Sequence, residues 1–276
     1  MSKFKYLAPL SISLMCFLDQ GAFAQDTSMH KMNMAGTAKP AFEKHGIKLY
    51  RVEDSPDFPD AKLTMKIPED NALLPEGKVS FQYDLSGYDL GKQTGDHHDC
   101  ANSAKGQHIH LILNNEPYIA LYDTKYSQEL KPGGYVALSF LSRSYHESVK
   151  HKGAYSLNYF IVGDDPSKHK VDLKAPLMFY SRPKGDYKGE AETKRILLDY
   201  YLVNCDLSKK GYNVKCTIDG TEFNFTKWEP YFIEGLGMGT HTITLELQDK
   251  YGMTVENKFN PVERHINLTA DDPVVK

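Results

Sequence analysis

The chain lacks most of the features that would indicate catalysis, nucleic-acid binding or membrane insertion. Its 276 residues include one tryptophan and four cysteines, with a formal net charge of −3 and a pI near 6.4. So small a charge gives no electrostatic basis for binding nucleic acid or an anionic membrane. The sequence contains no nucleophile elbow, no metalloprotease helix and no phosphate loop. We therefore predict a protein that is not an enzyme.

The first 24 residues are typical of an export signal. A basic start at Lys3 and Lys5 precedes a short apolar run over 7–18, and Ala22-Phe23-Ala24 forms a small-x-small cleavage site. The run is too short to span a bilayer, and no later stretch is long and apolar enough. We expect a soluble, secreted mature protein without a transmembrane segment, in the periplasm or outside the cell. Acylation of Cys16 is a less favoured alternative.

Removal of the signal would leave Cys100, Cys205 and Cys216, an odd number in an oxidising compartment. Cys205 and Cys216 flank a predicted hairpin turn at Lys210-Gly211. They are expected either to form a cross-strand disulfide or to be a reduced, buried pair. Cys100 is left over in both cases.

Residues 25–45 are predicted to be a disordered lead-in, because they contain almost no large aliphatic side chain. Met29, His30, Met32 and Met34 lie close together there. Thioether and imidazole groups suit copper, so the lead-in could bind this metal. The alternative is a flexible tail that happens to contain several methionines.

From His45 onward the pattern is all-β. Short segments rich in tyrosine and phenylalanine (18 and 13 in the chain) are separated by Pro, Gly, Asn and Asp. The sequence also repeats: residues 78–90 align without gaps with 195–207, and residues 109–114 align with 214–219. We predict two tandem immunoglobulin-like β-sandwiches, over residues 46–164 and 171–270.

Residues 106–113, Gly-Gln-His-Ile-His-Leu-Ile-Leu, carry the main candidate site. In a strand, side chains alternate between faces, so Ile109, Leu111 and Leu113 share one face and His108 and His110 the other. The aliphatic face is predicted to fill the core of the first sandwich. We expect the two imidazoles to point outward.

The loop before this strand exists in the first copy alone. From Leu90 to His110 there are 20 positions, and from Leu207 to the matching Lys215 there are 8, so the first copy has a 12-residue insertion. The insertion holds four further candidate ligands, His97, His98, Asp99 and Cys100. Imidazole, carboxylate and thiolate are ligands of copper and zinc. A polar, solvent-facing histidine pair beside a hydrophilic loop remains the alternative.

An anion site is a second candidate. Arg143 follows Ser142, and Arg182 follows Ser181. Arginine beside hydroxyl groups can hold phosphate or carboxylate through charge-assisted hydrogen bonds. The alternative is that these are ordinary charges at strand ends. His146 and Glu147, which follow the first of these segments, are expected near the end of the same sheet, and nothing marks them as catalytic.

The segments 105–118, 140–148 and 178–185 resemble a family of exported bacterial proteins labelled phosphopeptide-binding protein, and the resemblance covers nearly the whole mature chain. The first sandwich is also similar to small exported domains of unknown function with a His-rich strand. The resemblance implies a non-catalytic exported protein, and its label would make Arg143 and Arg182 the phosphate contacts.

Together these patterns predict an exported binding protein whose first sandwich binds copper or zinc. The alternatives are recognition of an anionic partner, such as a phosphorylated peptide, and a structural module at the cell surface.

Overall fold

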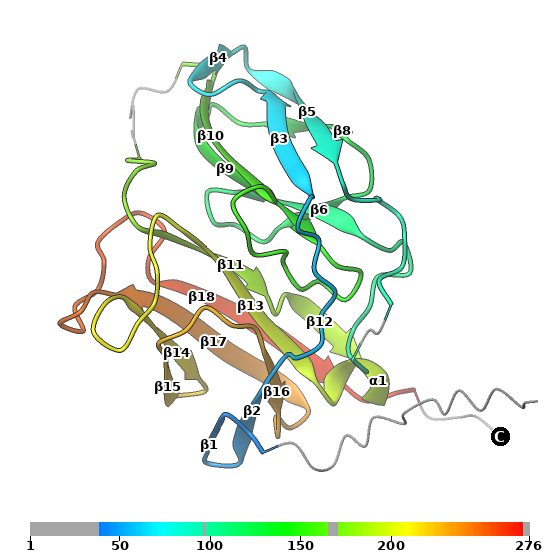
Figure 1. Cartoon of the computed structure of the whole chain (residues 1–276), viewed down its shortest axis with the longest axis vertical. Coiled ribbons are helices and arrows are strands. Elements are labelled where there is room, and N and C mark those ends of the chain that lie inside the picture. Colours follow the sequence, from blue (N-terminus) through cyan, green and yellow to red (C-terminus); the bar gives the residue numbers. More distant parts are fainter. Residues whose placement is uncertain (1–38, 96–97, 165–170, 273–276) are drawn as a thin grey trace, which may run out of the picture. The chain divides into compact units, whose positions relative to one another are not determined.

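The computed structural model describes residues 39–95, 98–164 and 171–272. Within these ranges the regular secondary structure is β-strand, except for one short helix, α1 (Glu190–Thr193) (Figure 1). The prediction of an all-β protein built from two immunoglobulin-like sandwiches is confirmed. The signal-like segment and the methionine-containing part of the lead-in lie outside the described residues.

The first sandwich joins a five-stranded sheet to a three-stranded one. The larger sheet has the order β4 (Ala72–Leu74), β10 (Tyr155–Val162), β9 (Gly133–Ser142), β6 (His108–Leu113), β7 (Ile119–Leu121). The smaller has the order β3 (Lys62–Ile67), β5 (Gly77–Ser86), β8 (Lys125–Leu130). Alternate side chains of β5 and β6, among them Phe81, Ile109 and Leu111, meet in a buried core, as the period of two predicts.

The second sandwich repeats this order. One sheet runs β12 (Gly185–Lys188), β18 (Val262–Thr269), β17 (Gly239–Gln248), β14 (Asn213–Ile218), β15 (Thr221–Phe225). The other contains β11 (Leu177–Arg182), β13 (Ile196–Val203) and β16 (Tyr231–Glu234). Each strand has its counterpart eight strands earlier, so the two halves share one topology.

Two strands near the N-terminus depart from the predicted boundaries. β1 (Phe42–Lys44) lies within the predicted lead-in, and β2 (Ile47–Arg51), which we expected in the first sandwich, pairs with β16 of the second. Ile47 and Leu49 supply the reason, since both point into the core of the second sandwich. Strands β1 and β2 thus belong to the second sandwich, although they precede the strands of the first sandwich in the sequence.

A third apolar cluster joins the two sandwiches. It combines Ile112, Leu138 and Phe140 of the first with residues of the second such as Phe179 and Tyr201. The Phe140 and Tyr201 rings stack, with their centroids 4.7 Å apart. The junction is thus a packed core in its own right, and both sandwiches belong to one compact unit.

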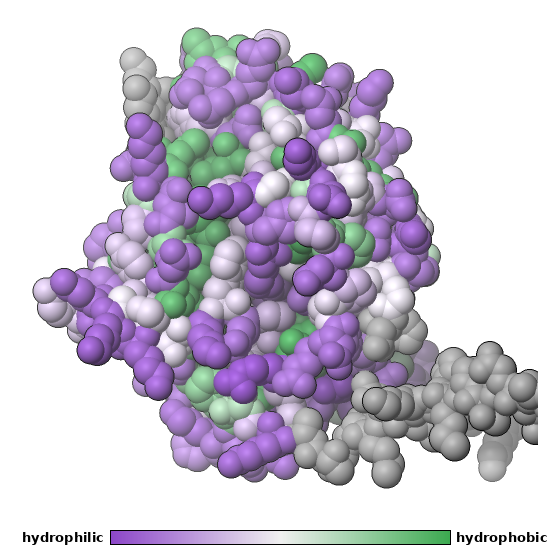
Figure 2. Space-filling view, viewed as in Figure 1, coloured by the Kyte–Doolittle hydropathy of each residue, from purple (hydrophilic) through white to green (hydrophobic). Residues whose placement is uncertain are grey.

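The outer face drawn in Figure 2 carries mainly hydrophilic side chains, with hydrophobic ones in patches between them.

Candidate metal centre

Strand β6 is buried on both faces, and this determines the surroundings of its histidines. All six of its residues are buried, whereas its counterpart β14 alternates between buried and half-buried positions. His108 and His110 have no exposed surface. The expectation that they point outward is wrong, because the second sandwich covers the face of β6 on which they lie.

A third histidine reaches the same place from the turn after β9. In this turn the Arg143 N–H donates to the Glu147 carbonyl and the His146 N–H to the Arg143 carbonyl. The turn after β17 has the same hydrogen bonds between Asp249, Met253 and Gly252. His146 has φ of 73° where Gly252 has 77°, a backbone conformation that non-glycine residues seldom adopt. A strained residue of this kind, where the other copy uses glycine, indicates a functional constraint.

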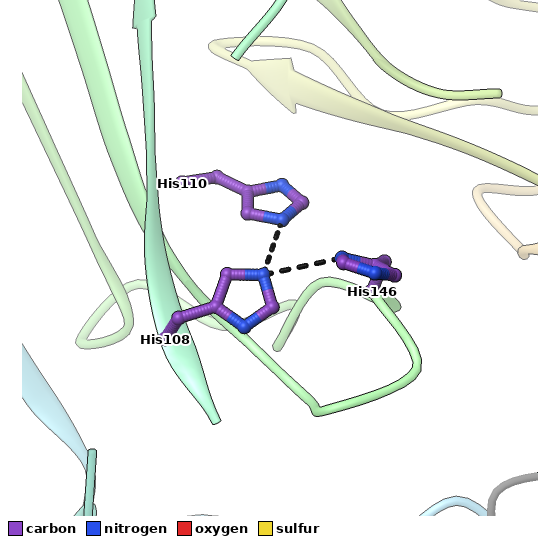
Figure 3. A group of neighbouring side chains, drawn as sticks. All are labelled: His108, His110 and His146. Atoms are coloured by element: carbon purple, nitrogen blue, oxygen red, sulfur yellow. Dashed lines mark hydrogen bonds between the residues drawn. The ribbon is translucent and has the colours of Figure 1, made fainter. Parts of the chain in front are cut away.

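The three imidazoles converge (Figure 3). The His108 Nε2 atom lies 2.9 Å from His110 Nε2 and 3.2 Å from His146 Nδ1. One ligand nitrogen from each ring lies within 4.8 Å of the others, and all three side chains are buried. Among the described residues, this group of potential ligands could hold a metal ion. Three histidines with an open fourth position are a common ligand set of zinc and copper.

Contacts behind the rings fix their orientation. The His108 Nδ1–H donates to the Gly106 carbonyl at 2.8 Å, so the Nε2 atom that faces the cluster carries a lone pair. The His110 Nδ1 atom lies 3.2 Å from the Ser181 hydroxyl of β11. Tyr118 stacks on His110, with centroids 3.5 Å apart and planes 9° apart, and its hydroxyl lies 3.3 Å from His146 Nδ1. Such outer contacts hold metal-binding histidines in place.

Burial keeps the cluster uncharged. Desolvation lowers the pKa of His108 to about 4, although its hydrogen bond to Gly106 acts in the opposite direction. Desolvation also lowers the pKa values of His110 and His146 well below the usual 6.5, assisted by neighbouring positive charge. Near neutral pH all three rings are therefore neutral, which is the form that binds a metal ion.

Of the ligands predicted in the insertion, the described ones, His98, Asp99 and Cys100, do not belong to the cluster. His97 lies outside the described residues. The His98 ring packs against Tyr145, with centroids 5.0 Å apart, and Asp99 is exposed. Cys100 is buried beside Tyr145 and Phe232, and burial raises the pKa of its thiol to about 12. His98 and Cys100 instead pack against Phe232 of the second sandwich.

The two serine-arginine segments have different environments. The Arg143 guanidinium lies 3.3 Å from the Glu147 carboxylate and donates to the Pro56 and Ser148 carbonyls. The Ser142 hydroxyl donates to the Arg143 carbonyl. Arg143 is therefore held by internal contacts, and its role as an anion contact stays a prediction. Ser181 and Arg182, in contrast, lie beside the histidine cluster.

The hairpin predicted between Cys205 and Cys216 is not formed. Cys216 lies on β14, where Phe223 and Leu245 are the residues opposite it. Strand β13, which precedes Cys205, belongs to the other sheet. Both cysteines are thiols that pack against the core of the second sandwich, which corresponds to the reduced, buried alternative.

His146 is the site residue for which the sequence analysis gave no ligand role. Its signal was available in the repeat, because alignment of the turns after 133–142 and 239–248 places His146 opposite Gly252.

No protein-family model and no curated protein matches the chain. Similar solved structures include fibronectin(III)-like modules of Clostridium thermocellum CbhA, at 12% identity and a TM-score of 0.27, covering 75% of this chain and 94% of that one. The central fibronectin-III array of RIM-binding protein matches at 9% identity and a TM-score of 0.25, covering 80% and 71%. Bacteroides ovatus SGBP-B, solved with a mixed-linkage heptasaccharide, matches at 10% and 0.23, also covering 80% and 71%.

In the described ranges, no helix has the length and apolar character needed to cross a membrane.

Proposed function

We propose that this chain is an exported, non-catalytic protein that binds one transition-metal ion, copper or zinc, through His108, His110 and His146. The observation that carries the proposal is the convergence of three buried, neutral imidazoles, each with one nitrogen within 4.8 Å of the others. In the metal-free protein, the lone pair on His108 Nε2 can accept an N–H hydrogen bond from His110 Nε2 at 2.9 Å or from His146 Nδ1 at 3.2 Å. A bound cation would take the place of the shared proton and use one nitrogen of each ring as a ligand.

The two halves of the chain make different contributions to this site. The ligands come from the first sandwich, and the Ser181 hydroxyl behind His110 comes from the second. The first sandwich alone would expose β6 to water. The bound ion is therefore proposed to lie at the junction, and the second sandwich to act as its cover.

Recognition of a phosphorylated peptide, which the family resemblance implies, stays a prediction. Arg143 is held by Glu147 and backbone carbonyls, so it is poorly placed to bind a phosphate. Arg182, the other residue of that prediction, contacts Tyr118, the tyrosine that stacks on His110.

The test is metal analysis of the protein purified without a histidine tag, followed by copper and zinc titration with a competing chelator. We expect close to one ion per chain. The most informative variant is His146→Gly, because it removes one ligand and supplies the residue that the second copy uses at the same φ. It should lower the affinity at least tenfold without destabilising the turn through strain. His265→Ala, which removes an exposed histidine elsewhere, is the matched control. Equal affinity in both variants would contradict the proposal.

A further inference from the structure

Arg182 is a buried cation that has no carboxylate partner among the described residues. Its side chain is 8% exposed, and one terminal NH group donates to the Tyr187 hydroxyl at 2.9 Å. Its Nε atom has no hydrogen-bond partner. Within the described residues, Arg182 forms no ion pair with a carboxylate. An uncompensated buried charge is costly, so its presence calls for a reason.

A β-bulge directs this side chain toward the cluster. Tyr180 pairs with Tyr200 and Arg182 with Asp199, so that Ser181 is an additional residue in β11. A bulge of this kind disturbs strict alternation and re-aims a side chain. Consequently both Ser181, which contacts His110, and Arg182 lie on the side of the histidines. The first copy has a bulge at the same place but carries Ile67 there, so the fold itself does not require arginine.

Tyr118 links Arg182 to the metal ligands. Its ring stacks on His110, while the Arg182 guanidinium carbon lies 5.4 Å from the ring centroid and the Lys184 Nζ atom 4.2 Å from it. Lys184 also donates to the Tyr118 carbonyl at 2.7 Å. Two cations thus lie next to three imidazoles, and their positive charge contributes to the lowered pKa values of His110 and His146.

The charges of this region do not balance with a metal alone. Three neutral histidines add no negative charge, so a divalent ion would join Arg182 and Lys184 in a desolvated site of positive charge only. The described carboxylates form no ion pair with either side chain. Three protein ligands also leave one position open on a four-coordinate ion. A single anion would offset the positive charge and also occupy the fourth position.

We propose that a small anion completes the site, bound to the metal at the fourth position and hydrogen-bonded to Arg182. This inference rests on the proposed metal site. The anion must be small, because His108 and His110 are fully buried and His146 is only 9% exposed. A phosphorylated peptide does not fit this requirement. The anion accepts hydrogen bonds from the guanidinium and neutralises part of the charge around the metal.

The test uses the full chain loaded with Cu(II) and azide as the probe. Metal content is measured first for each variant, and azide is then titrated by the absorbance of its charge-transfer band with copper. Arg182→Met should keep the copper and bind azide at least about tenfold more weakly, since a charged hydrogen bond to the anion is lost. Arg195→Met is the matched control, because Arg195 is ion-paired with Glu234 at 2.9 Å. Its azide affinity should stay within about twofold of the unchanged protein.

The two proposals fail in different ways. Unchanged protein that takes up no metal refutes the metal site and this inference with it. Copper uptake with equal azide affinity in the unchanged protein and Arg182→Met refutes the anion alone. If Arg182→Met does not fold, Arg182→Lys is the second variant. It keeps the charge but loses the planar fork, and we expect weaker azide binding with copper retained. Unchanged azide affinity in that variant would also overturn the proposal.

Discussion

Acid should destabilise the metal-free protein through its buried histidines, and His108 gives the magnitude. In the unfolded chain its pKa is the ordinary 6.5, and in the folded protein burial lowers it to about 4. The folded state therefore holds fewer protons than the unfolded state between these values. The contribution of His108 to stability is fully present above pH 6.5 and is lost as the pH falls toward 4.

The expected loss follows from proton linkage. Going from pH 7 to pH 5 should lower the free energy of unfolding by about 2 kcal/mol from His108 alone, and the full shift corresponds to about 3 kcal/mol. His110 and His146 act in the same direction, because their pKa values are lowered too. With an m-value of about 2 kcal/mol per molar urea, the unfolding midpoint should fall by about 1 M.

The assay is urea unfolding in the presence of a chelator at pH 7 and pH 5. The variant His108→Asn keeps a polar side chain that does not titrate in this range, so its midpoint should fall less than that of the unchanged protein. His265→Asn, at an exposed position, should behave like the unchanged protein. A midpoint that falls equally in His108→Asn would refute the argument that burial holds His108 neutral.

Three further predictions concern the packing around the site. Phe140→Ala should cost about 3–5 kcal/mol of stability in urea unfolding, because Phe140 is fully buried between the sandwiches, and a cost below about 1 kcal/mol would contradict a packed junction. Asp199 is fully buried and accepts hydrogen bonds from the Ser148 N–H and the Lys150 Nζ atom, so Asp199→Ala should cost about 3–5 kcal/mol and weaken metal binding by loosening the turn of His146. Thermal unfolding measures the loss of stability in Asp199→Ala, and competition with a chelator measures its loss of metal affinity. Glu43→Ala, at an exposed position, is the control. In Gly106→Ala the new Cβ would lie 2.5 Å from the Gly91 carbonyl oxygen, so the backbone must shift and displace the Gly106 carbonyl that accepts from His108. Metal affinity should then fall about 10- to 100-fold. Gly220→Ala, with a similar φ and open space around the new Cβ, should leave the metal affinity unchanged.

The sequence was sufficient for the fold class and for two of the three proposed ligands. Strand alternation assigned Ile109 and Leu111 to the core and His108 and His110 to the opposite face, because that period is a local property of the backbone. The internal repeat predicted two copies of one topology, because equivalent strands bury side chains at equivalent positions and therefore keep the same apolar pattern in both copies.

The remainder depended on contacts between distant segments. Whether the histidine face meets water or another domain is decided by how the two sandwiches pack, and no local pattern records that. His146 comes from a turn whose importance lies in an unusual φ, a property visible in the sequence only through its alignment with Gly252. For the same reason the insertion looked like the source of further ligands, although its described residues pack elsewhere.

Burial of the cluster also has a kinetic consequence. Ligand exchange at an exposed metal proceeds by attack of water or a chelator on the ion, but His108 and His110 leave no surface for such an attack. An ion bound there can leave only when the turn of residues 143–148 opens or the sandwiches separate. Its residence time is therefore set by the frequency of that opening, and chelators should remove it at a rate that does not depend on their concentration.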